Sequence, residues 1–169
     1  MTAEEWRAIP GWEGYYEASS AGRLRSLDRF VPVKSSKPRR VRGRVLKPRM
    51  HKGYLITNLV RDGRLRTRSV HQLVIAAFKG LPREGMVTRH LDGNALNNAI
   101  ENLEYGTPSE NVQDSIAHGT HWLASRSECL AGHAYTPENT GRKSTGARRC
   151  LTCKRAAARR ARERRREAA

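Results

Sequence analysis

The sequence predicts an α+β protein whose central unit is a two-stranded hairpin followed by a short helix. Three observations support this fold class. Residues 86–119 follow a strand–loop–strand–helix pattern, residues 1–70 form short alternating segments broken by glycines, and closely spaced Cys and His residues come later in the chain. Strands and helices that are grouped without regular alternation are typical of α+β proteins. We predict three units, which span residues 1–48, 49–120 and 121–169.

Aromatic residues and glycines intermingle over residues 6–22. This composition is typical of short strands joined by turns. We expect most of these aromatic side chains to build a small core, because they bury a large apolar area. Arg23 and Arg25 alternate with Leu24 in the strand that follows, so the two guanidinium groups share a face.

Basic residues dominate residues 29–52, where Pro38 and Gly43 argue against a helix and favour a loop or hairpin. The basic residues of this segment include Lys34, Lys37, Arg39, Arg40, Arg42, Arg44, Lys47, Arg49 and Lys52.

A second hairpin is predicted at residues 53–70, with Asp62-Gly63 as its turn. Arg64, Arg66 and Arg68 alternate along its return strand, so three guanidinium groups project from one face. Residues 23–68 contain 16 basic and 2 acidic residues. A basic β-ribbon of this kind can follow phosphates; the alternative is an edge strand that its charges protect from aggregation.

Residues 70–78 are predicted to form an amphipathic helix that packs beneath the central hairpin. The apolar positions that carry the helical period are Val70, Leu73, Val74, Ala77 and Phe78. His71 lies near the start of this helix, and we interpret it as a structural or hydrogen-bonding histidine rather than a second catalytic group.

The central unit has the strongest local signals. Arg89 and His90 end a strand, Asp92 opens a turn with Gly93 and Asn94, and residues 103–105 return. The helix that follows has Thr107 as N-cap, Pro108 in its first turn and Glu110 to complete a capping box, and Gly119 ends it. This order places His90 on the hairpin and Asn111 in the first helical turn, facing it.

Two short spacings, C-x3-H and C-x2-C, occur in the last third of the chain with 16 residues between them. Four such ligands suit a tetrahedral, structural zinc ion, Zn2+, and all three cysteines of the chain belong to the set. A redox-active CxxC is the alternative, but no βαβ pattern surrounds it. The predicted ligands are Cys129, His133, Cys150 and Cys153.

Residues 154–169 are rich in Ala and Arg, which form helices readily, but no apolar stripe is present. Residues 141–169 contain 12 basic and 2 acidic residues. We expect a phosphate-binding arm that is partly disordered when free and helical on DNA. His118 and His121 receive no role.

The whole chain carries 33 Lys and Arg against 16 Asp and Glu, a net charge of +17. Such an excess repels itself and favours binding to a polyanion. No apolar run is long enough to cross a membrane, and no signal-peptide pattern is present. We therefore expect a soluble, cytoplasmic protein with no membrane partner. We also expect a monomer or weak dimer.

The segment from Val70 to Asn111 resembles the HNH endonuclease family, in particular its phage and intron-encoded homing-type branch. The resemblance rests on His90, Asn102 and Asn111, which lie 12 and 9 residues apart, and on the capped helix. It implies a ββα-metal (HNH, His-Me finger) nuclease core. Residues 6–27 resemble the NUMOD4-like module that accompanies such domains, and the Cys/His segment resembles zinc-binding segments of some phage HNH proteins. A phage-infected bacterial host is implied.

By this resemblance His90 is the general base, Asn102 braces the hairpin and Asn111 ligates Mg2+ or Mn2+ during hydrolysis of double-stranded DNA. Asp92 is a candidate second ligand. The products would carry 5′-phosphate and 3′-hydroxyl ends, from a nick or a double-strand cut. The residues expected to bind DNA are Arg23, Arg25, Arg39, Arg40, Arg42, Arg44, Arg64, Arg66, Arg68, Arg159 and Arg160.

Arg89 departs from the family pattern, in which Asp, Asn or His often precedes the base and supplies a metal ligand. Arginine has no lone pair to offer. Either the cation is bound by Asn111, water and the substrate phosphate, with Asp92 as a further ligand, or cation binding at this site is weakened. Arg89 is also a candidate for holding the scissile phosphate.

Three alternatives compete with a nuclease. The chain could be a DNA-binding protein that kept the scaffold and lost catalysis, or a factor that binds RNA or nucleoprotein, although no base-stacking motif is present. His90 and its asparagines could also be loop-capping residues only.

Overall fold

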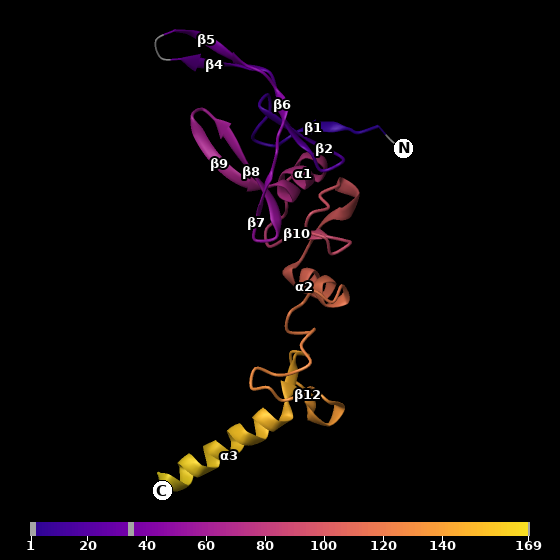
Figure 1. The fold of residues 1–169 in the computed structure, drawn as a ribbon, viewed down its shortest axis with the longest axis vertical. Helices are drawn as coiled ribbons and strands as arrows, with labels where there is room; N and C mark the ends of the chain where they lie inside the picture. The colour runs from indigo at the N-terminus through magenta and orange to yellow at the C-terminus, as the bar shows by residue number, and fades with distance from the viewer. Residues whose placement is uncertain (1–2, 34–35, 169) are drawn as a thin grey trace. The chain divides into compact units, whose positions relative to one another are not determined.

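A computed structural model describes residues 3–33 and 36–168, which form two compact units, one ending at Thr120 and one beginning at His121 (Figure 1). Lys34, one of the predicted basic residues, lies outside the described residues. The fold is α+β, as predicted. No helix within the described residues is long and apolar enough to span a membrane.

Unit 1 begins with short antiparallel strands. A four-stranded sheet has the order β1 (Trp6–Ala8), β2 (Tyr16–Ser19), β3 (Leu24–Ser26) and β6 (Arg44–Val45). Between β3 and β6 the chain makes a separate hairpin of β4 (Arg29–Val33) and β5 (Ser36–Val41). The basic segment predicted as loop or hairpin is therefore mostly strand, with part of it in this ribbon (Figure 1).

A three-stranded sheet follows, made of β7 (Arg49–His51), β8 (Tyr54–Arg61) and β9 (Arg64–Ser69). The predicted hairpin of β8 and β9 is confirmed. Its two turn residues, Asp62 and Gly63, have φ angles of 52° and 72°, the left-handed geometry that a two-residue hairpin turn requires.

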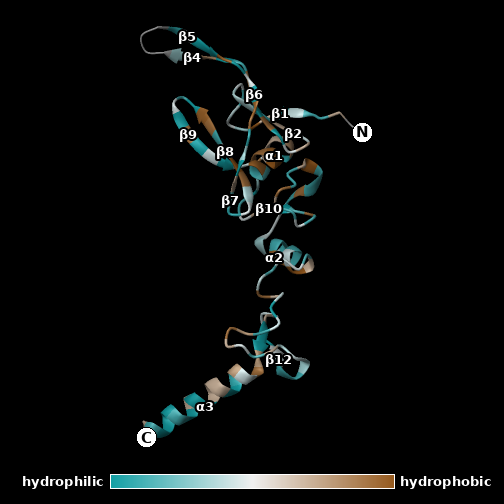
Figure 2. Ribbon diagram, viewed as in Figure 1, coloured by the Kyte–Doolittle hydropathy of each residue, from teal (hydrophilic) through white to brown (hydrophobic). Residues whose placement is uncertain are grey.

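The hydrophobic core of unit 1 forms around α1 (Val70–Lys79), where Figure 2 concentrates the hydrophobic colour. Val70, Val74 and Ile75 are fully buried there, together with Leu24 from β3 and Leu103 from β11 (Leu103–Gly106). Residues from both sides of the predicted boundary at 48/49 thus share one core.

A close backbone approach reinforces this union. A Cβ on Gly22 would lie 2.7 Å from the carbonyl of Asn98, and the N–H of Ile100 donates to the carbonyl of Ser20 at 2.9 Å. Segments 1–48 and 49–120 therefore share one compact unit within the described residues, and the second unit begins at His121.

The central unit is a ββα arrangement of β10 (Val87–His90), β11 and α2 (Pro108–Ala117), with the short 3-10 helix η1 (Ile100–Asn102) before β11. The predicted capping box is present. The Thr107 hydroxyl accepts the N–H of Glu110, and the Glu110 carboxylate accepts the N–H of Thr107. The helix is thereby fixed directly after the hairpin.

Unit 2 contains the 3-10 helix η2 (Pro137–Asn139), a hairpin of β12 (Thr140–Arg142) and β13 (Arg148–Cys150), and the helix α3 (Leu151–Glu167). Residues 154–167 of the predicted arm are helical, and no residue of α3 is buried. Hydrophilic colour runs along most of α3 in Figure 2.

Candidate active site, metal centre and basic surfaces

His90 ends β10, where it is half-buried between the hairpin and α1. Its Nε2 lies 3.4 Å from Oδ1 of Asn98, a side chain that is only 4% exposed. Burial lowers the pKa of His90 below its ordinary value, while the hydrogen bond to Asn98 and the charge of Asp92 act in the opposite direction. The imidazole is therefore neutral at pH 7, the form that can accept a proton.

The imidazole of His90 belongs to a cluster of three rings, together with His71 and Tyr54. The rings of His71 and His90 meet edge to face with centroids 5.1 Å apart, and the ring of Tyr54 lies 5.2 Å from that of His71. His71 is 8% exposed, and burial lowers its pKa to about 4. Because it stays neutral, His71 adds no positive charge beside His90.

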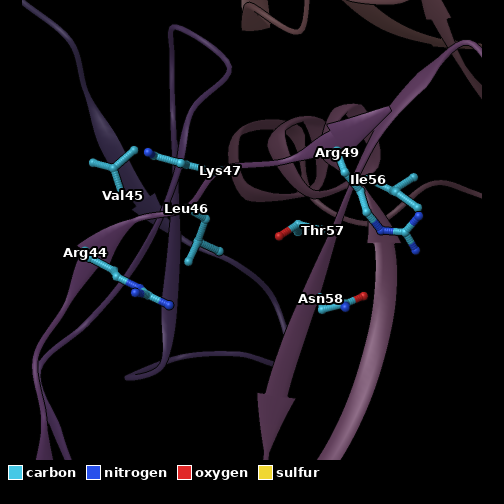
Figure 3. A pocket seen from close by; sticks show the side chains of 8 residues that line it. All are labelled: Arg44, Val45, Leu46, Lys47, Arg49, Ile56, Thr57 and Asn58. Atoms are coloured by element: carbon cyan, nitrogen blue, oxygen red, sulfur yellow. The ribbon is translucent and has the colours of Figure 1, made fainter. Parts of the chain in front are cut away.

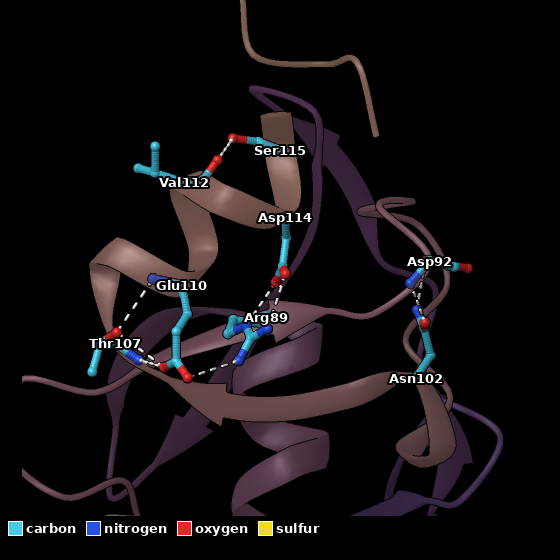
Figure 4. A network of polar contacts seen from close by, with 8 residues as sticks. All are labelled: Arg89, Asp92, Asn102, Thr107, Glu110, Val112, Asp114 and Ser115. Atoms are coloured by element: carbon cyan, nitrogen blue, oxygen red, sulfur yellow. Dashed lines mark hydrogen bonds and ion pairs between the residues drawn. The ribbon is translucent and has the colours of Figure 1, made fainter. Parts of the chain in front are cut away.

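Asn102 is buried and holds the loop between the two strands (Figure 4). Its Nδ2 donates to Asp92 Oδ1 and to the carbonyl of Asn97, both at 2.8 Å, and its Oδ1 accepts the N–H of Asp92 at 2.9 Å. The other Asp92 oxygen accepts Nδ2 of Asn97 at 2.7 Å. Both oxygens of the proposed second ligand thus serve this network.

Replacing Asn102 with alanine is expected to lower the free energy of unfolding by about 2–4 kcal/mol, because it removes three hydrogen bonds and leaves buried polar groups unpaired. Urea unfolding of the full chain measures this. Asn94→Ala removes one exposed side-chain acceptor and should cost less than about 1 kcal/mol. Equal costs for the two variants would show that Asn102 is not the brace.

Asn111 lies in the first turns of α2, and its side chain is exposed. Together with His90 it lines a cavity of about 140 Å³, to which Asp114, Ser115 and His118 also contribute. The structure therefore brings the hairpin histidine and the helical asparagine to one cavity. Asp92 and Arg89 are not among the residues that line it.

Arg89 points instead to α2 and joins it to the hairpin (Figure 4). Its Nε and Nη2 donate to the two carboxylate oxygens of Asp114 at 2.6 and 2.9 Å, and its Nη1 lies 3.7 Å from Glu110. The ion pair lowers the pKa of Asp114. A Cβ on Gly106 would lie 2.4 Å from Arg89 Cδ, so the glycine makes room for this side chain. The guanidinium of Arg89 is thus engaged with two carboxylates of α2.

The four predicted zinc ligands converge in unit 2. The Sγ atoms of Cys129 and Cys153 lie 3.7 Å apart, and Nδ1 of His133 lies 3.3–3.8 Å from the three sulfur atoms. Tetrahedral zinc, with bonds of about 2.3 Å to sulfur and about 2.0 Å to nitrogen, sets these separations at about 3.8 and 3.6 Å. The donor set and its geometry fit that ion.

A backbone hydrogen bond favours the thiolate form of Cys150, the form that zinc requires, whereas the hydrogen bonds with Cys129 and Cys150 raise the pKa of Cys153 to about 11. The N–H groups of His133 and Cys153 donate to Sγ of Cys129 and Cys150, each at 3.4 Å. The bond from Cys153 lowers the pKa of Cys150 to about 6. Asn139 ties the centre to the helix, since its Oδ1 accepts the N–H and hydroxyl of Thr152.

The predicted DNA-binding arginines fall into two groups. Four of them form ion pairs: Arg23 with Glu4, Arg25 with Glu17, Arg40 with Asp28 and Arg159 with Glu163. Among the residues that the structure describes, no ion pair involves Arg39, Arg42, Arg44, Arg64, Arg66, Arg68 or Arg160.

A basic groove of about 370 Å³ runs between β6 and β8 (Figure 3). Arg44, Lys47 and Arg49 line it together with Thr57 and Asn58. Cations beside polar side chains of a β-sheet suit phosphate oxygens, so Lys47 and Arg49 are further candidates for phosphate contact beside the predicted arginines.

Sequence reasoning missed Tyr54 and Asn98 as neighbours of His90. Asn98 lies in the Asn-rich loop, so its residue type was a signal, but its contact with His90 depends on how that loop closes. Tyr54 comes from β8, far from His90 in sequence, and only the tertiary fold joins them.

Comparison with known proteins gives matches for two segments of unit 1. Residues 4–60 match the NUMOD4 motif, and residues 68–113 match the HNH endonuclease family. Unit 2 lies outside both matched segments.

Curated relatives include the DNA endonuclease I-HmuI of Bacillus phage SP01, which is 36% identical over 117 residues, covering 69% of this chain and 60% of the relative. An uncharacterized HNH endonuclease (L245) of Acanthamoeba polyphaga mimivirus is 33% identical over 115 residues, 68% of this chain and 31% of the relative. The chain thus spans 60% or less of these two relatives.

A solved structure, described as DNA binding and cleavage by the HNH homing endonuclease I-HmuI, matches with a TM-score of 0.54 and 36% identity. The match covers 69% of this chain and 60% of that chain.

Proposed function

Because the chain belongs to the HNH endonuclease family, we propose that it is a DNA endonuclease that uses a divalent cation to hydrolyse phosphodiester bonds. The observation that carries the proposal is the shared cavity of His90 and Asn111, one from the hairpin and one from the helix. Its matched relative I-HmuI is named a DNA endonuclease, which supports DNA as the substrate, and we propose that this DNA is double-stranded.

The donor set suits a hard cation with few protein ligands. Magnesium prefers oxygen donors and keeps waters and substrate phosphate in its coordination shell, and the exposed amide oxygen of Asn111 meets that requirement. We assign Asn111 as the main protein ligand of Mg2+ or Mn2+. Asp92, the second candidate, contributes chiefly to the loop because both of its oxygens accept hydrogen bonds there.

The neutral imidazole of His90 accepts the proton of the attacking water, with Asn98 orienting the ring through Nε2. Asn102 keeps the loop that carries His90 in place. Asn111 would hold the cation, which would supply charge stabilisation at the phosphate and the leaving 3′-oxygen. The expected products carry 5′-phosphate and 3′-hydroxyl ends.

The presence of arginine at position 89 favours one competing function, DNA binding without catalysis. Arg89 stands where relatives often have a metal ligand, and the nearest carboxylates, Asp114 and Glu110, are engaged with it. In that case the protein would bind DNA with a steep salt dependence and leave it intact.

We further propose that the protein acts as a monomer or weak dimer and that a monomer nicks one strand. We also propose that cleavage takes place in the cytoplasm of a phage-infected bacterium. The named sources of two relatives, a Bacillus phage and a Bacillus subtilis prophage, support that setting.

The pH dependence of cleavage tests the role of His90. Because burial lowers the pKa of His90, the rate should rise as the imidazole loses its proton, and the midpoint of this rise should lie below the ordinary histidine pKa of about 6.5. Asn98→Ala removes a hydrogen bond that favours the charged form, so it should move the rise to lower pH. The measurement is the single-turnover rate on end-labelled duplex with magnesium from pH 4.5 to 8.

A rise that stays in place in Asn98→Ala, in protein shown to be folded by circular dichroism, would assign the titration to another group. A complete absence of cleavage across the pH range, with DNA binding retained, would favour the non-catalytic alternative.

A further inference from the structure

Unit 2 is organised around the Cys/His centre rather than around an apolar core. Its buried residues, within the described part of the chain, are Cys129 and Cys150, both ligands of that centre. The last two ligands, Cys150 and Cys153, are the N-cap and a first-turn residue of α3. A metal at this centre therefore fixes the direction in which α3 leaves the hairpin.

The helix itself has no structural partner over most of its length. It contains 17 residues, none of them buried, and one exposed ion pair between Arg159 and Glu163 at 3.6 Å. Such a pair adds little stability, and an isolated helix of this length is marginal in water. Eight basic residues against two acidic ones, Glu163 and Glu167, also repel each other within α3.

The basic residues of α3 are not distributed evenly. Arg155, Arg159, Arg162 and Arg166 follow the spacing i, i+4, i+7 and i+11, which places them on one face of a helix. We call these four residues the arginine stripe. Arg160 and Arg164 are also four residues apart. At 100° of rotation per residue, they lie about 100–180° around the helix axis from the centre of the stripe.

We propose that α3 is a DNA-binding helix that lays the arginine stripe into a groove of double-stranded DNA and that the zinc centre orients it. The stripe is about 16 Å long at 1.5 Å per residue, which matches about five base pairs. The major groove admits an α-helix, and guanidinium groups suit both phosphates and guanine edges. The inference shares its DNA partner with the proposed function but concerns a separate unit.

A matched pair of variants tests the stripe in the full-length, zinc-loaded protein. Arg159→Gln with Arg162→Gln removes two stripe charges, and Arg160→Gln with Arg164→Gln removes two charges from elsewhere on the helix. Binding of a labelled 30-base-pair duplex is followed by fluorescence anisotropy without magnesium, at several salt concentrations, so the result does not depend on cleavage. Circular dichroism checks that both variants keep the helix.

The stripe variant should lose about tenfold or more in affinity, and its salt slope should fall by about two, one per lost phosphate contact. The other variant should lose less than about threefold, with little change in slope. Cys153→Ser, which disorders the centre, should bring both charge variants to the same affinity. This last comparison shows whether the metal centre orients the stripe.

Equal losses in the two charge variants would overturn the proposal, because α3 would then act only through its net charge. No loss in either would make the helix a solvated tail. Duplex RNA of the same sequence that competes better than DNA would overturn the assignment of the partner. None of these outcomes bears on whether unit 1 cleaves DNA.

Discussion

His90→Ala should lower the rate of DNA cleavage by about 100- to 10,000-fold, the usual contribution of a positioned general base. The imidazole is half-buried and neutral, it lines the same cavity as Asn111, and Asn98 orients its Nε2. Affinity for DNA should stay within about twofold, because the basic sheets and α3 are unaffected. Single-turnover cleavage and anisotropy on the same duplex give the two values.

His118→Ala is the matched control for this experiment. His118 lines the same cavity from the end of α2, and its side chain is exposed. Its loss should reduce the rate by less than about tenfold, since no step of the proposed reaction depends on it. Comparable losses from His90→Ala and His118→Ala would mean that His90 is no more than one of several lining groups.

Removal of zinc should unfold unit 2 while unit 1 stays folded. The buried residues of unit 2 are themselves ligands, so little apolar burial remains to stabilise the hairpin and α3 once the metal leaves. We expect one zinc ion per chain, and a loss of helical dichroism that corresponds to the 17 residues of α3. The two helices of unit 1, α1 and α2, should be retained.

Cys153→Ser should reproduce this loss, because serine oxygen is a poor replacement for a zinc thiolate. His121→Ala, which changes a histidine of unit 2 outside the Cys/His group, should retain both zinc and helix. A Cys153→Ser protein with bound zinc and full helicity would contradict the assignment of the metal centre.

The sequence predicted best the features that depend on neighbouring residues. The capping box of Thr107 and Glu110 and the Asp62-Gly63 turn are local interactions, and both are present as predicted. The convergence of Cys129, His133, Cys150 and Cys153 also follows from two short spacings, which leave few ways to arrange the four side chains. These features need little information about the rest of the fold.

Features that depend on contacts between distant segments were not predictable in the same way. Arg89 could be recognised as an unusual residue, but its ion pair with Asp114 depends on how α2 packs against β10. The common core of residues 1–48 and 49–120 likewise depends on the approach of Gly22 to Asn98. Hydrophobic pattern alone does not distinguish two small cores from one shared core.

Substitution of Arg89 tests whether residue 89 limits binding of the cation. The cation would be weakly held if residue 89 offers no ligand, and Arg89→Asp adds a carboxylate at that position. The same substitution removes the ion pair to Asp114 and places two carboxylates near each other. The double variant Arg89→Asp with Asp114→Arg keeps an opposite pair of charges and is therefore the better comparison.

Endonuclease activity is tested by cleavage of supercoiled plasmid by the wild-type, zinc-loaded protein, with and without added magnesium or manganese. Omitting the cation, rather than adding a chelator, leaves the zinc centre intact. We expect relaxed, nicked plasmid only when magnesium or manganese is present, with ends that DNA ligase can rejoin. Plasmid that stays supercoiled with either cation, although the folded protein binds it, would contradict the assignment of the His90 and Asn111 cavity as an endonuclease active site.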